Sequence, residues 1–286
     1  DFHVHTDFSD GADPPERVVE RAAGLGFSFL AVSDHDTVGG LRPARSRAEA
    51  LGLRLVSAVE VSATAEGSDI HLLGYLVDEE NGEFVSALEG VVARRRGRVR
   101  RMIEKLQRLG VPADAEAFFA RFPRGWAGRL NLAHYLVEEG LVPSVEAVFG
   151  RYLGAGRPAY EPVDALTTAE AIQIIHKAGG VAVLAHPGRN GADALIPRLV
   201  EEGLSGIEAY HSSHSPAAAE SYRKIADARG LVVTGGSDCH GKDASDPLLG
   251  TVRMPVGMLE ALEARAGGPR RSGGSGPGGF KGAKGG

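Results

Sequence analysis

Histidines and carboxylates gather at the ends of apolar runs in this sequence. The chain has 10 histidines, and four clusters hold half of them: His3-Val4-His5, Ser33-Asp34-His35-Asp36, Ala185-His186-Pro187 and Ser237-Asp238-Cys239-His240. Neutral imidazole and carboxylate together bind Zn, Mn or Fe well. A chain of this length would rarely collect so many of them at strand ends for packing alone. The pattern therefore predicts a multi-metal hydrolase.

The first cluster shows how neighbouring residues could share one cation. In a strand, residues i and i+2 point to the same side, so His3 and His5 can both reach one ion. A single His-x-His pair is weak evidence by itself. Asp10 adds a carboxylate close by, and its alternative interpretation is a turn residue before Gly11.

Three further positions interrupt or end buried apolar runs. Glu60 ends the apolar run 55–59, where a buried carboxylate needs a cation or a strong donor to offset its desolvation. It could bridge two metals. His71 and His186, each taken alone, would more often be core histidines, but the surrounding pattern favours metal ligation.

The elements that must position these residues read as an α/β barrel. Near-continuous apolar runs, typical of parallel strands buried on both faces, predict strands at residues 2–5, 29–33, 54–60, 70–76, 181–185, 206–210 and 231–236. Helical patterns lie between several of them, at residues 14–25, 40–51, 168–178, 192–202 and 216–229. In such barrels the active site lies at the carboxyl ends of the strands, where most of the candidate ligands would fall.

Residues 80–162 break this rhythm and predict an inserted helical subdomain that could cover the barrel mouth. We expect the barrel at 1–79 and 163–266, and a disordered, basic, Gly-rich tail at 267–286. The first helix of the insert, 84–109, has two distinct sides. Its apolar side holds Val92, Val99, Met102, Ile103, Leu106 and Leu109, and its basic side holds Arg94, Arg98, Arg101, Lys105 and Arg108. The basic side is either a solvated helix face or a track for a polyanion.

Composition excludes some classes of protein. The chain has 286 residues, is 43% hydrophobic and carries a formal net charge of −5. No run approaches the roughly 18 apolar residues of a membrane span. A single cysteine, Cys239, excludes an internal disulfide framework. We therefore expect a cytoplasmic protein with no membrane association and no obligate protein partner.

The motifs in their order resemble those of a known family. His3-x-His5, Ser33-Asp34-His35-Asp36, Glu60, His71, His186-Pro187 and Ser237-Asp238-x-His240 are similar to the motifs of the polymerase and histidinol phosphatase (PHP) superfamily. The resemblance covers residues 1 to about 264 and implies a distorted (β/α)7 barrel. Asp10-Gly11, Gly128-Arg129 and the run 207–211 look most like the bacterial 3',5'-nucleotide bisphosphate phosphatases and 5'-3' exoribonucleases of the RNase AM type.

The resemblance implies three divalent cations, with a full set of ligands in this sequence. The first cation would bind His3, His5, Glu60 and Asp238, the second Glu60, His71 and His186, and the third Asp10, His35 and His240. Asp34 and Asp36 would orient ligands or helix ends. The family often uses Mn, and the ligand types also suit Fe or Zn.

The chemistry that such a centre performs follows from charge. Two cations about 4 Å apart can neutralise a phosphate ester, lower the pKa of a bridging water and aim the resulting hydroxide at phosphorus. His211, at the family position, is the candidate that protonates the leaving oxygen or binds phosphate. His214 is the alternative, although it is more often a loop histidine. Cys239 would point away from the ligands and is not expected to be a nucleophile.

Substrate binding is less strongly encoded. Arg129, with Arg157 behind it, is the candidate for a second phosphate, and its alternative is an ordinary surface arginine. Relatives often have Gly-Arg-Pro-His where this chain has Gly-Arg-Leu-Asn, so Asn131 stands in place of a histidine. His134, about one helical turn further, could substitute. Trp126 is alone in the chain, so no aromatic stacking platform for single strands is visible.

These features favour a metal-dependent phosphoesterase for phosphorylated nucleotides. It would remove the 3'-phosphate of 3',5'-bisphosphates and trim short RNA from the 5' end, because both reactions cut a 3'-phosphoester while a 5'-phosphate is anchored. Histidinol-phosphate phosphatase, or another small-molecule phosphatase of the superfamily, is the alternative within the family. A DNA-polymerase proofreading module is disfavoured because no polymerase sequence follows. A nucleotide-binding regulator with inert metals is the alternative outside enzymes.

Overall fold

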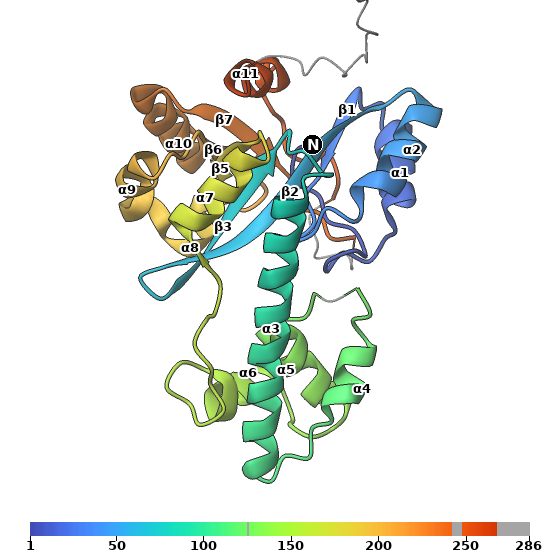
Figure 1. Cartoon of the computed structure of the whole chain (residues 1–286), viewed down its shortest axis with the longest axis vertical. Helices are drawn as coiled ribbons and strands as arrows, with labels where there is room; N and C mark the ends of the chain where they lie inside the picture. Colours follow the sequence, from blue (N-terminus) through green and yellow to red (C-terminus); the bar gives the residue numbers. More distant parts are fainter. Residues whose placement is uncertain (125, 242–247, 268–286) are drawn as a thin grey trace, which may run out of the picture.

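The chain folds around one seven-stranded sheet. The computed structural model describes residues 1–124, 126–241 and 248–267. The strands are β1 (Phe29–Val32), β2 (Arg54–Ala65), β3 (Ser68–Tyr75), β4 (Leu166–Thr167), β5 (Val181–Leu184), β6 (Gly206–His211) and β7 (Val232–Gly236). They are ordered β1-β2-β3-β5-β6-β7, and β4 pairs with the far end of β2. The sheet curls into the distorted α/β barrel expected from the sequence (Figure 1).

One strand runs against the expected parallel order. β3 is antiparallel to both of its neighbours, β2 and β5. A two-residue turn joins β2 to β3, and both turn residues, Glu66 and Gly67, have positive φ angles of 51° and 79°. That is the backbone of a tight hairpin. Burial on both faces gives parallel and antiparallel strands the same apolar pattern, which is why the sequence misled here.

Residues 1–5, predicted to contain a strand, close the barrel without forming a regular one. The His5 N–H donates to the Cys239 carbonyl at 2.9 Å, and the Ser33 N–H donates to the Val4 carbonyl at 2.9 Å. The segment therefore lies between the end of β7 and the end of β1. Its ladder is interrupted because the Val4 N–H donates to the Ser33 side chain at 3.1 Å instead of to backbone. Only an isolated bridge, Val4 to Cys239, results.

Helices cover the outside of the barrel. They are α1 (Pro15–Gly24), α2 (Leu41–Leu51), α7 (Thr168–Lys177), α8 (Pro187–Asn190), η2 (Ala192–Leu195), α9 (Ile196–Glu201), α10 (Pro216–Arg229) and α11 (Met258–Arg265). The helix expected over 192–202 is divided into a 3-10 turn and α9, and Pro197, in the first turn of α9, offers no N–H to continue a single helix. The ends of α10 match the prediction.

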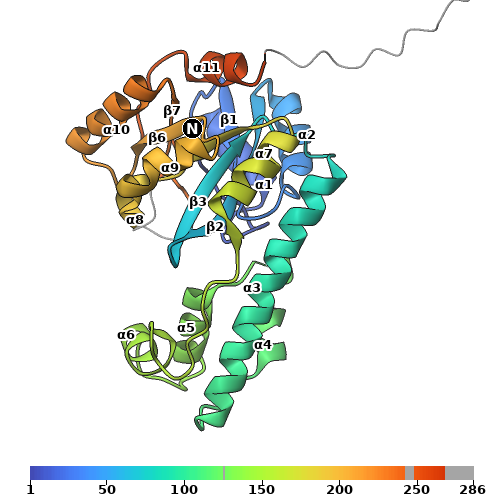
Figure 2. The ribbon, with the colours of Figure 1, turned by 60° about the vertical axis from the view of Figure 1, so that its left-hand side comes forward.

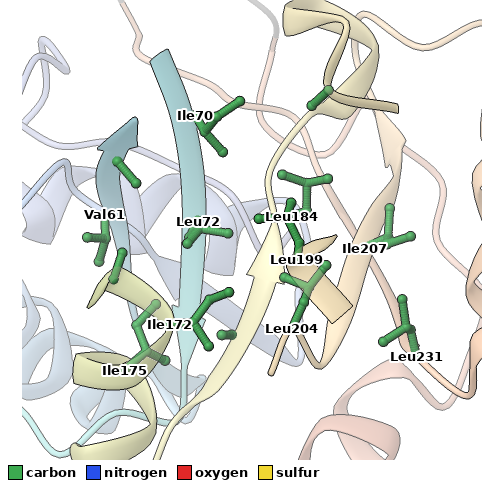
Figure 3. Packing of buried hydrophobic residues seen from close by; sticks show 14 of the residues in the cluster. Val61, Ile70, Leu72, Ile172, Ile175, Leu184, Leu199, Leu204, Ile207 and Leu231 are labelled. Carbon is green, nitrogen blue, oxygen red and sulfur yellow. The ribbon is translucent and has the colours of Figure 1, made fainter. Parts of the chain in front are cut away.

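The largest part of the core lies between the sheet and α7, α9 and α10. Ile172 and Ile175 of α7 pack beside Val61 and Leu72 of β2 and β3, and all four side chains are fully buried (Figure 3). The start of α7 is fixed by a capping box, in which Thr167 and Glu170 bond each other's backbone N–H groups. This packing holds the strands whose ends carry the candidate ligands.

Between β3 and β4 the chain forms a helical segment, residues 82–153. It contains α3 (Gly82–Arg108), α4 (Ala115–Ala120), α5 (Arg129–Glu138), α6 (Val145–Val148) and η1 (Phe149–Leu153). The first half of α3 packs on the barrel through Phe84 and Leu88, whereas its second half belongs to a separate apolar cluster with α4 and α5 (Figure 2). The exact domain boundaries stay predictions.

The two sides expected for the first helix of this segment need correction. Arg98, placed on the basic side, is buried with 8% exposure instead of solvated, and Leu109, placed on the apolar side, is 45% exposed. Arg101 and Lys105 pair with Glu161, so part of the basic side is neutralised by the chain itself.

Two further expectations concern the surroundings of the protein. Among the described residues, no helix is long and apolar enough to cross a membrane. The predicted disordered tail, 267–286, lies outside the described residues except for Gly267.

Candidate metal centre

The candidate ligands meet at one end of the barrel. Beyond the end of β1, the motif Asp34–Asp36 keeps pairing with β2, since the Asp36 N–H donates to the Glu60 carbonyl at 2.9 Å. His71 lies near the start of β3 rather than at its end. Because β3 is antiparallel, its amino end is at the same edge of the sheet as the carboxyl ends of the parallel strands. The reversal of β3 therefore brings His71 to the other ligands.

Four of the candidates form a fully buried group, which we call cluster A. It consists of His3, His5, Glu60 and Asp238, whose ligand atoms all lie within 4.8 Å of one another. Nε2 of His5 lies 3.1 Å from Oδ1 of Asp238 and 3.3 Å from Oε2 of Glu60. This is the set that the resemblance assigned to the first cation.

A second group, cluster B, shares His5 with the first. It consists of His5, Asp10, His35 and His240. Nε2 of His240 lies 3.2 Å from Oδ2 of Asp10. Nε2 of His35 lies 3.9 Å from Oδ1 of Asp10. The three residues assigned to the third cation are thus together, and His5 is an addition to them.

A third group, cluster C, involves both oxygens of Glu60, because Nδ1 of His35 lies 3.2 Å from Oε2 and Nδ1 of His71 lies 2.9 Å from Oε1. It consists of His35, Glu60 and His71. His186 joins it, because its Nε2 and the Nδ1 of His71 each lie 2.9 Å from Oε1 of Glu60. All nine predicted ligands therefore lie in three adjoining groups, and Glu60 is common to two of them.

Several buried polar atoms of these clusters lack hydrogen-bond partners within the described residues and could bind a cation instead. Nε2 of His3, Oε2 of Glu60 and Nδ1 of His35 are buried and have no hydrogen-bond partner among the described residues. Orphaned polar atoms of this kind are costly unless something binds them. Imidazole nitrogens and carboxylate oxygens at these spacings suit Mn, Fe or Zn. The residues therefore fit divalent cations.

The pKa values of His3 and His5 show how strongly cluster A favours positive charge. Burial disfavours the charged form of His3, but Glu208, Glu60 and Asp238 outweigh it and raise its pKa well above the usual value. Burial likewise opposes the charge of His5, yet the neighbouring carboxylates of Asp238 and Glu60 raise its pKa to about 10. Without cations, protons take their place.

The residues that support the ligands are mostly those expected. Oδ1 of Asp34 accepts from the Thr6 N–H and the Ser9 hydroxyl, each at 2.7 Å, which fixes the turn that leads to Asp10. Asp36 accepts from the Ser62 N–H at 2.7 Å and from Arg95 at 2.8 Å. Asp34 and Asp36 thus orient their neighbours.

Glu208 is a supporting residue that sequence reasoning missed. It is fully buried, and its carboxylate accepts from Nδ1 of His3 at 3.0 Å and from the His186 N–H at 2.8 Å. It therefore orients one ligand of cluster A and the backbone of one ligand beside cluster C. The only signal in the sequence was an acidic residue inside the apolar run 207–210.

Backbone strain is concentrated at the same place. Three residues at the site have positive φ angles, which residues other than glycine seldom adopt. They are Asp36 (53°), His186 (28°) and Asp238 (59°). Two of the three are candidate ligands and the third adjoins one. Strained backbone held by surrounding hydrogen bonds is typical of functional sites.

A pocket of about 410 Å³ opens onto the clusters. Its lining from the barrel includes Asp10, His35, Glu60, His71, His186, Arg189, Asp238 and His240, and its lining from the helical segment includes Arg95, Arg98, Trp126, Arg129 and Asn131. Carboxylates and histidines thus share one pocket with four arginines. That combination suits an anionic substrate bound beside cations.

The predicted substrate contacts divide into two groups. Arg129 and Asn131 line the pocket, and Asn131 also accepts from the Gly128 N–H at 2.9 Å, which fixes the start of α5. Arg157 and His134 are exposed and do not line the pocket. The structure therefore does not bring these last two to the site.

The two candidate acids differ in the partners of their rings. In His214, Nδ1 bonds to the Ala209 carbonyl at 2.9 Å and Nε2 accepts from the Gly188 N–H at 3.2 Å, so both nitrogens serve local structure. In His211, Nδ1 accepts from the Ser213 N–H at 3.0 Å, and Nε2 lies 3.4 Å from Oδ2 of Asp238. His211 adjoins a candidate ligand, although it is buried and does not line the pocket.

Three arginines and the tryptophan of the pocket had not been assigned to the site. Arg98 belongs to the basic side of the first helix of the insert, where a polyanion track was the alternative interpretation. Arg95, on the same helix, had been assigned to neither side. Arg189 follows the His186-Pro187 motif and donates to Oδ2 of Asp238 at 2.6 Å. Trp126 carried no local signal, because its position depends on contacts far apart in the sequence.

Comparisons with known proteins agree with this geometry. A family model described as PHP domain matches residues 1–104. The 5'-3' exoribonuclease Rnm of Escherichia coli K12 is 33% identical over 84% of this chain and 84% of its own length. The 3',5'-nucleoside bisphosphate phosphatase of Chromobacterium violaceum is 34% identical over 84% of this chain and 86% of its own length.

Two further matches extend over more of the chain. The phosphoribosyl 1,2-cyclic phosphate 1,2-diphosphodiesterase of Eggerthella lenta is 34% identical over 90% of this chain and 99% of its own length. A protein of Bifidobacterium adolescentis described as a metal-dependent phosphoesterase has a known crystal structure. It is 32% identical, with a TM-score of 0.80 over 94% of this chain and 96% of that one. The similarity therefore includes the helical segment as well as the barrel.

Proposed function

Because this chain belongs to the PHP domain family and is a metal-dependent phosphoesterase, we propose that it hydrolyses the 3'-phosphoester of 5'-phosphorylated nucleotides. Its substrates would be 3',5'-nucleoside bisphosphates and short RNA, which it would shorten from the 5' end. The observation that carries the proposal is the pocket, in which ligands for cations and several arginines line one space. Two relatives with these two activities support it.

The metal ligands that we propose are those of clusters A, B and C. Three cations would be held by His3, His5, Glu60 and Asp238, by Glu60, His71 and His186, and by Asp10, His35 and His240. Such cations neutralise phosphate and lower the pKa of water. Mn is the metal that we propose, with Fe or Zn as alternatives. We also infer a cytoplasmic protein without an obligate protein partner.

The arginines of the helical segment would anchor the 5'-phosphate. Arg98 is buried, donates from Nε to the Glu161 carbonyl at 3.0 Å, and keeps Nη2 buried without a hydrogen-bond partner. Burial lowers its pKa, Asp69 opposes this effect, and Arg129 and Arg95 add to it by repulsion. A dianionic phosphate would satisfy the unpaired donor and relieve the repulsion among the three arginines.

Residues beside cluster A would act on the other phosphate. Arg189, half exposed in the pocket, is bound to Asp238 and is close enough to a candidate ligand to bind a phosphate oxygen there. His211 would hold Asp238 in place and is the candidate that supplies a proton to the leaving oxygen. Neither role requires the side chain of Cys239, which is buried at the bridge to Val4.

The test is phosphate release by Mn-loaded protein from adenosine 3',5'-bisphosphate, with 5'-AMP, 3'-AMP and histidinol phosphate in parallel. We expect strong preference for the bisphosphate, and 5'-phosphorylated RNA of a few nucleotides should release mononucleotides. Preference for histidinol phosphate would support the alternative within the family.

One relative motivates an additional substrate in the same assay. Phosphoribosyl 1,2-cyclic phosphate, like the bisphosphate, has one phosphate that the arginines could anchor and a second phosphoester that could be cut. The Eggerthella lenta enzyme matches this chain along 99% of its own length. Faster turnover of that compound than of the bisphosphate would overturn the nucleotide assignment and leave the metal centre intact.

A further inference from the structure

Among the described residues, no hydrogen bond fixes the ring of His35, in contrast to the rings of His3 and His240. Nδ1 of His3 is held by Glu208 at 3.0 Å, and Nδ1 of His240 by the Asp238 carbonyl at 2.8 Å. The two ring nitrogens of His35 instead face carboxylates of two different clusters, Glu60 at 3.2 Å and Asp10 at 3.9 Å. Ligating histidines normally donate their second N–H to an orienting group. Something else must therefore orient His35.

Aromatic contacts supply that orientation. The His35 ring is stacked between two other rings, with the centroid of His5 at 4.6 Å and that of Trp126 at 4.7 Å. The planes of His35 and Trp126 are only 12° apart. Stacked rings at this separation attract each other and resist tilting. The indole of Trp126 therefore fixes the plane of the His35 ring on the side toward the helical segment.

Arg95 holds the same region from α3. Its Cζ lies 5.1 Å from the centre of the Trp126 ring, a distance at which a cation and an aromatic ring attract. Its Nη2 donates to Oδ2 of Asp36, the residue after His35. Arg95 and Trp126 both belong to the helical segment, whereas His35 and Asp36 belong to the barrel.

We propose that Trp126 is a positioning residue that holds His35 in the orientation in which it binds metal. Through this contact the helical segment takes part in building the metal centre, in addition to lining the pocket. The inference rests on the proposed metal ligands. Removing an outer partner of a ligand typically weakens metal binding by about 10–100-fold. Loss of the indole should therefore weaken the cation bound through His35 by at least about tenfold.

The chain contains a convenient reporter of this contact. Trp126 is its single tryptophan, so its fluorescence can be followed without interference from others. Mn²⁺ bound through His35 would lie within a few ångströms of the indole and quench its emission. Addition of Mn²⁺ to the metal-free protein should lower the emission with the midpoint of the cation that is bound through His35.

The experiment compares Mn²⁺ content and affinity, by equilibrium dialysis and elemental analysis, in the wild type, Trp126→Ala and Trp126→Phe. Phe122→Leu is the matched control, because Phe122 lies in the same loop and packs on Phe118 rather than on His35. Thermal unfolding of each metal-free variant verifies that it folds. We expect Trp126→Ala to lose about one equivalent or to bind it at least about tenfold more weakly, and Trp126→Phe and the control to resemble the wild type.

The outcomes separate the two proposals. If the folded wild type binds no Mn²⁺ stoichiometrically, the metal centre of the proposed function fails. If the wild type binds it and Trp126→Ala matches it in both content and affinity, the role of Trp126 alone is refuted. Full occupancy of the wild type without any change in emission would also refute that role.

Discussion

Replacement of Glu208 by glutamine should detach His3 from its cation while the fold survives. When His3 binds metal through Nε2, its Nδ1 carries the proton and donates it to Glu208. The same carboxylate accepts from the His186 N–H at 2.8 Å. A glutamine must keep its oxygen toward that N–H, so its NH₂ group faces His3. The NH₂ group, at the position 3.0 Å from Nδ1, then favours the tautomer in which Nδ1 accepts and Nε2, the atom that should bind metal, carries the proton. The amide oxygen, at the position 3.2 Å from Nδ1, competes with it as an acceptor for the Nδ1 proton.

The expected magnitude follows from that conflict. Glutamine has nearly the shape of glutamate, so packing around this fully buried side chain is preserved. Loss of one orienting partner should weaken metal binding by about 10–100-fold, or about 1.4–2.8 kcal/mol. Activity at low Mn²⁺ should fall by a similar factor, and most of it should return when Mn²⁺ is raised.

The assay is the Mn²⁺ dependence of phosphate release, together with equilibrium dialysis. Glu202→Gln is the control, because the Glu202 carboxylate also accepts a hydrogen bond, from the Thr168 hydroxyl at 2.6 Å, but its partner is not a candidate metal ligand. An unchanged Mn²⁺ affinity in folded Glu208→Gln protein would refute the tautomer argument. A loss of activity that no Mn²⁺ concentration restores would refute it as well.

Three further outcomes are expected. Arg98→Met should remove a charged hydrogen bond to the 5'-phosphate, worth about 1.5–3 kcal/mol, and so lower kcat/KM for the 3',5'-bisphosphate by roughly 10–100-fold. The kcat/KM for 3'-AMP, which has no 5'-phosphate, should change little. Equal losses on both substrates, or a similar loss in the exposed control Arg151→Met, would contradict the role of Arg98 as the phosphate anchor. Burial lowers the pKa values of His3 and His5, but the surrounding carboxylates raise them by more, to about 10 for His5. In the absence of metal, both histidines therefore hold protons at neutral pH. Metal must displace these protons, so Mn²⁺ affinity should rise with pH by about tenfold per pH unit for each proton released. Equilibrium dialysis from pH 6 to 8 measures this slope, and an affinity independent of pH would exclude the competition. Mn²⁺ at 100 times its dissociation constant should stabilise the fold by about 2.7 kcal/mol per site, so chelation should lower the thermal midpoint, and an unchanged midpoint would argue against tight native-state binding.

The candidate ligands could be proposed from sequence because each lies in or beside an apolar strand. A histidine or carboxylate stands out there, and the motif spacing orders the ligands along the barrel. Glu60 and Asp238 illustrate this, since both are buried and both were identified before their partners were visible. The ends of α10 could also be found, because Ser215 caps it, Pro216 begins it and Gly230 ends it.

Contacts between distant parts of the chain could not be found in the same way. The direction of β3 depends on a two-residue turn at Glu66, which carries no strong turn signal. The burial of Arg98 depends on the Glu161 carbonyl, 63 residues away. Trp126 stacks on His35, 91 positions away in the sequence, and the local sequence around neither residue predicts this contact. Local patterns thus gave the ligands, and only the fold gave the arginines and the indole around them.

The continuity of α3 has a consequence for which molecules can react. This single helix has 27 residues, and it is anchored at one end in the barrel core and at the other in the separate cluster of the helical segment. Arg95 and Arg98 are fixed on that rod rather than on loops. If these arginines hold one phosphate as proposed, the rigid helix fixes the distance between that phosphate and the cations. Substrates would then be selected by the length between their two phosphates, with the base left free to vary.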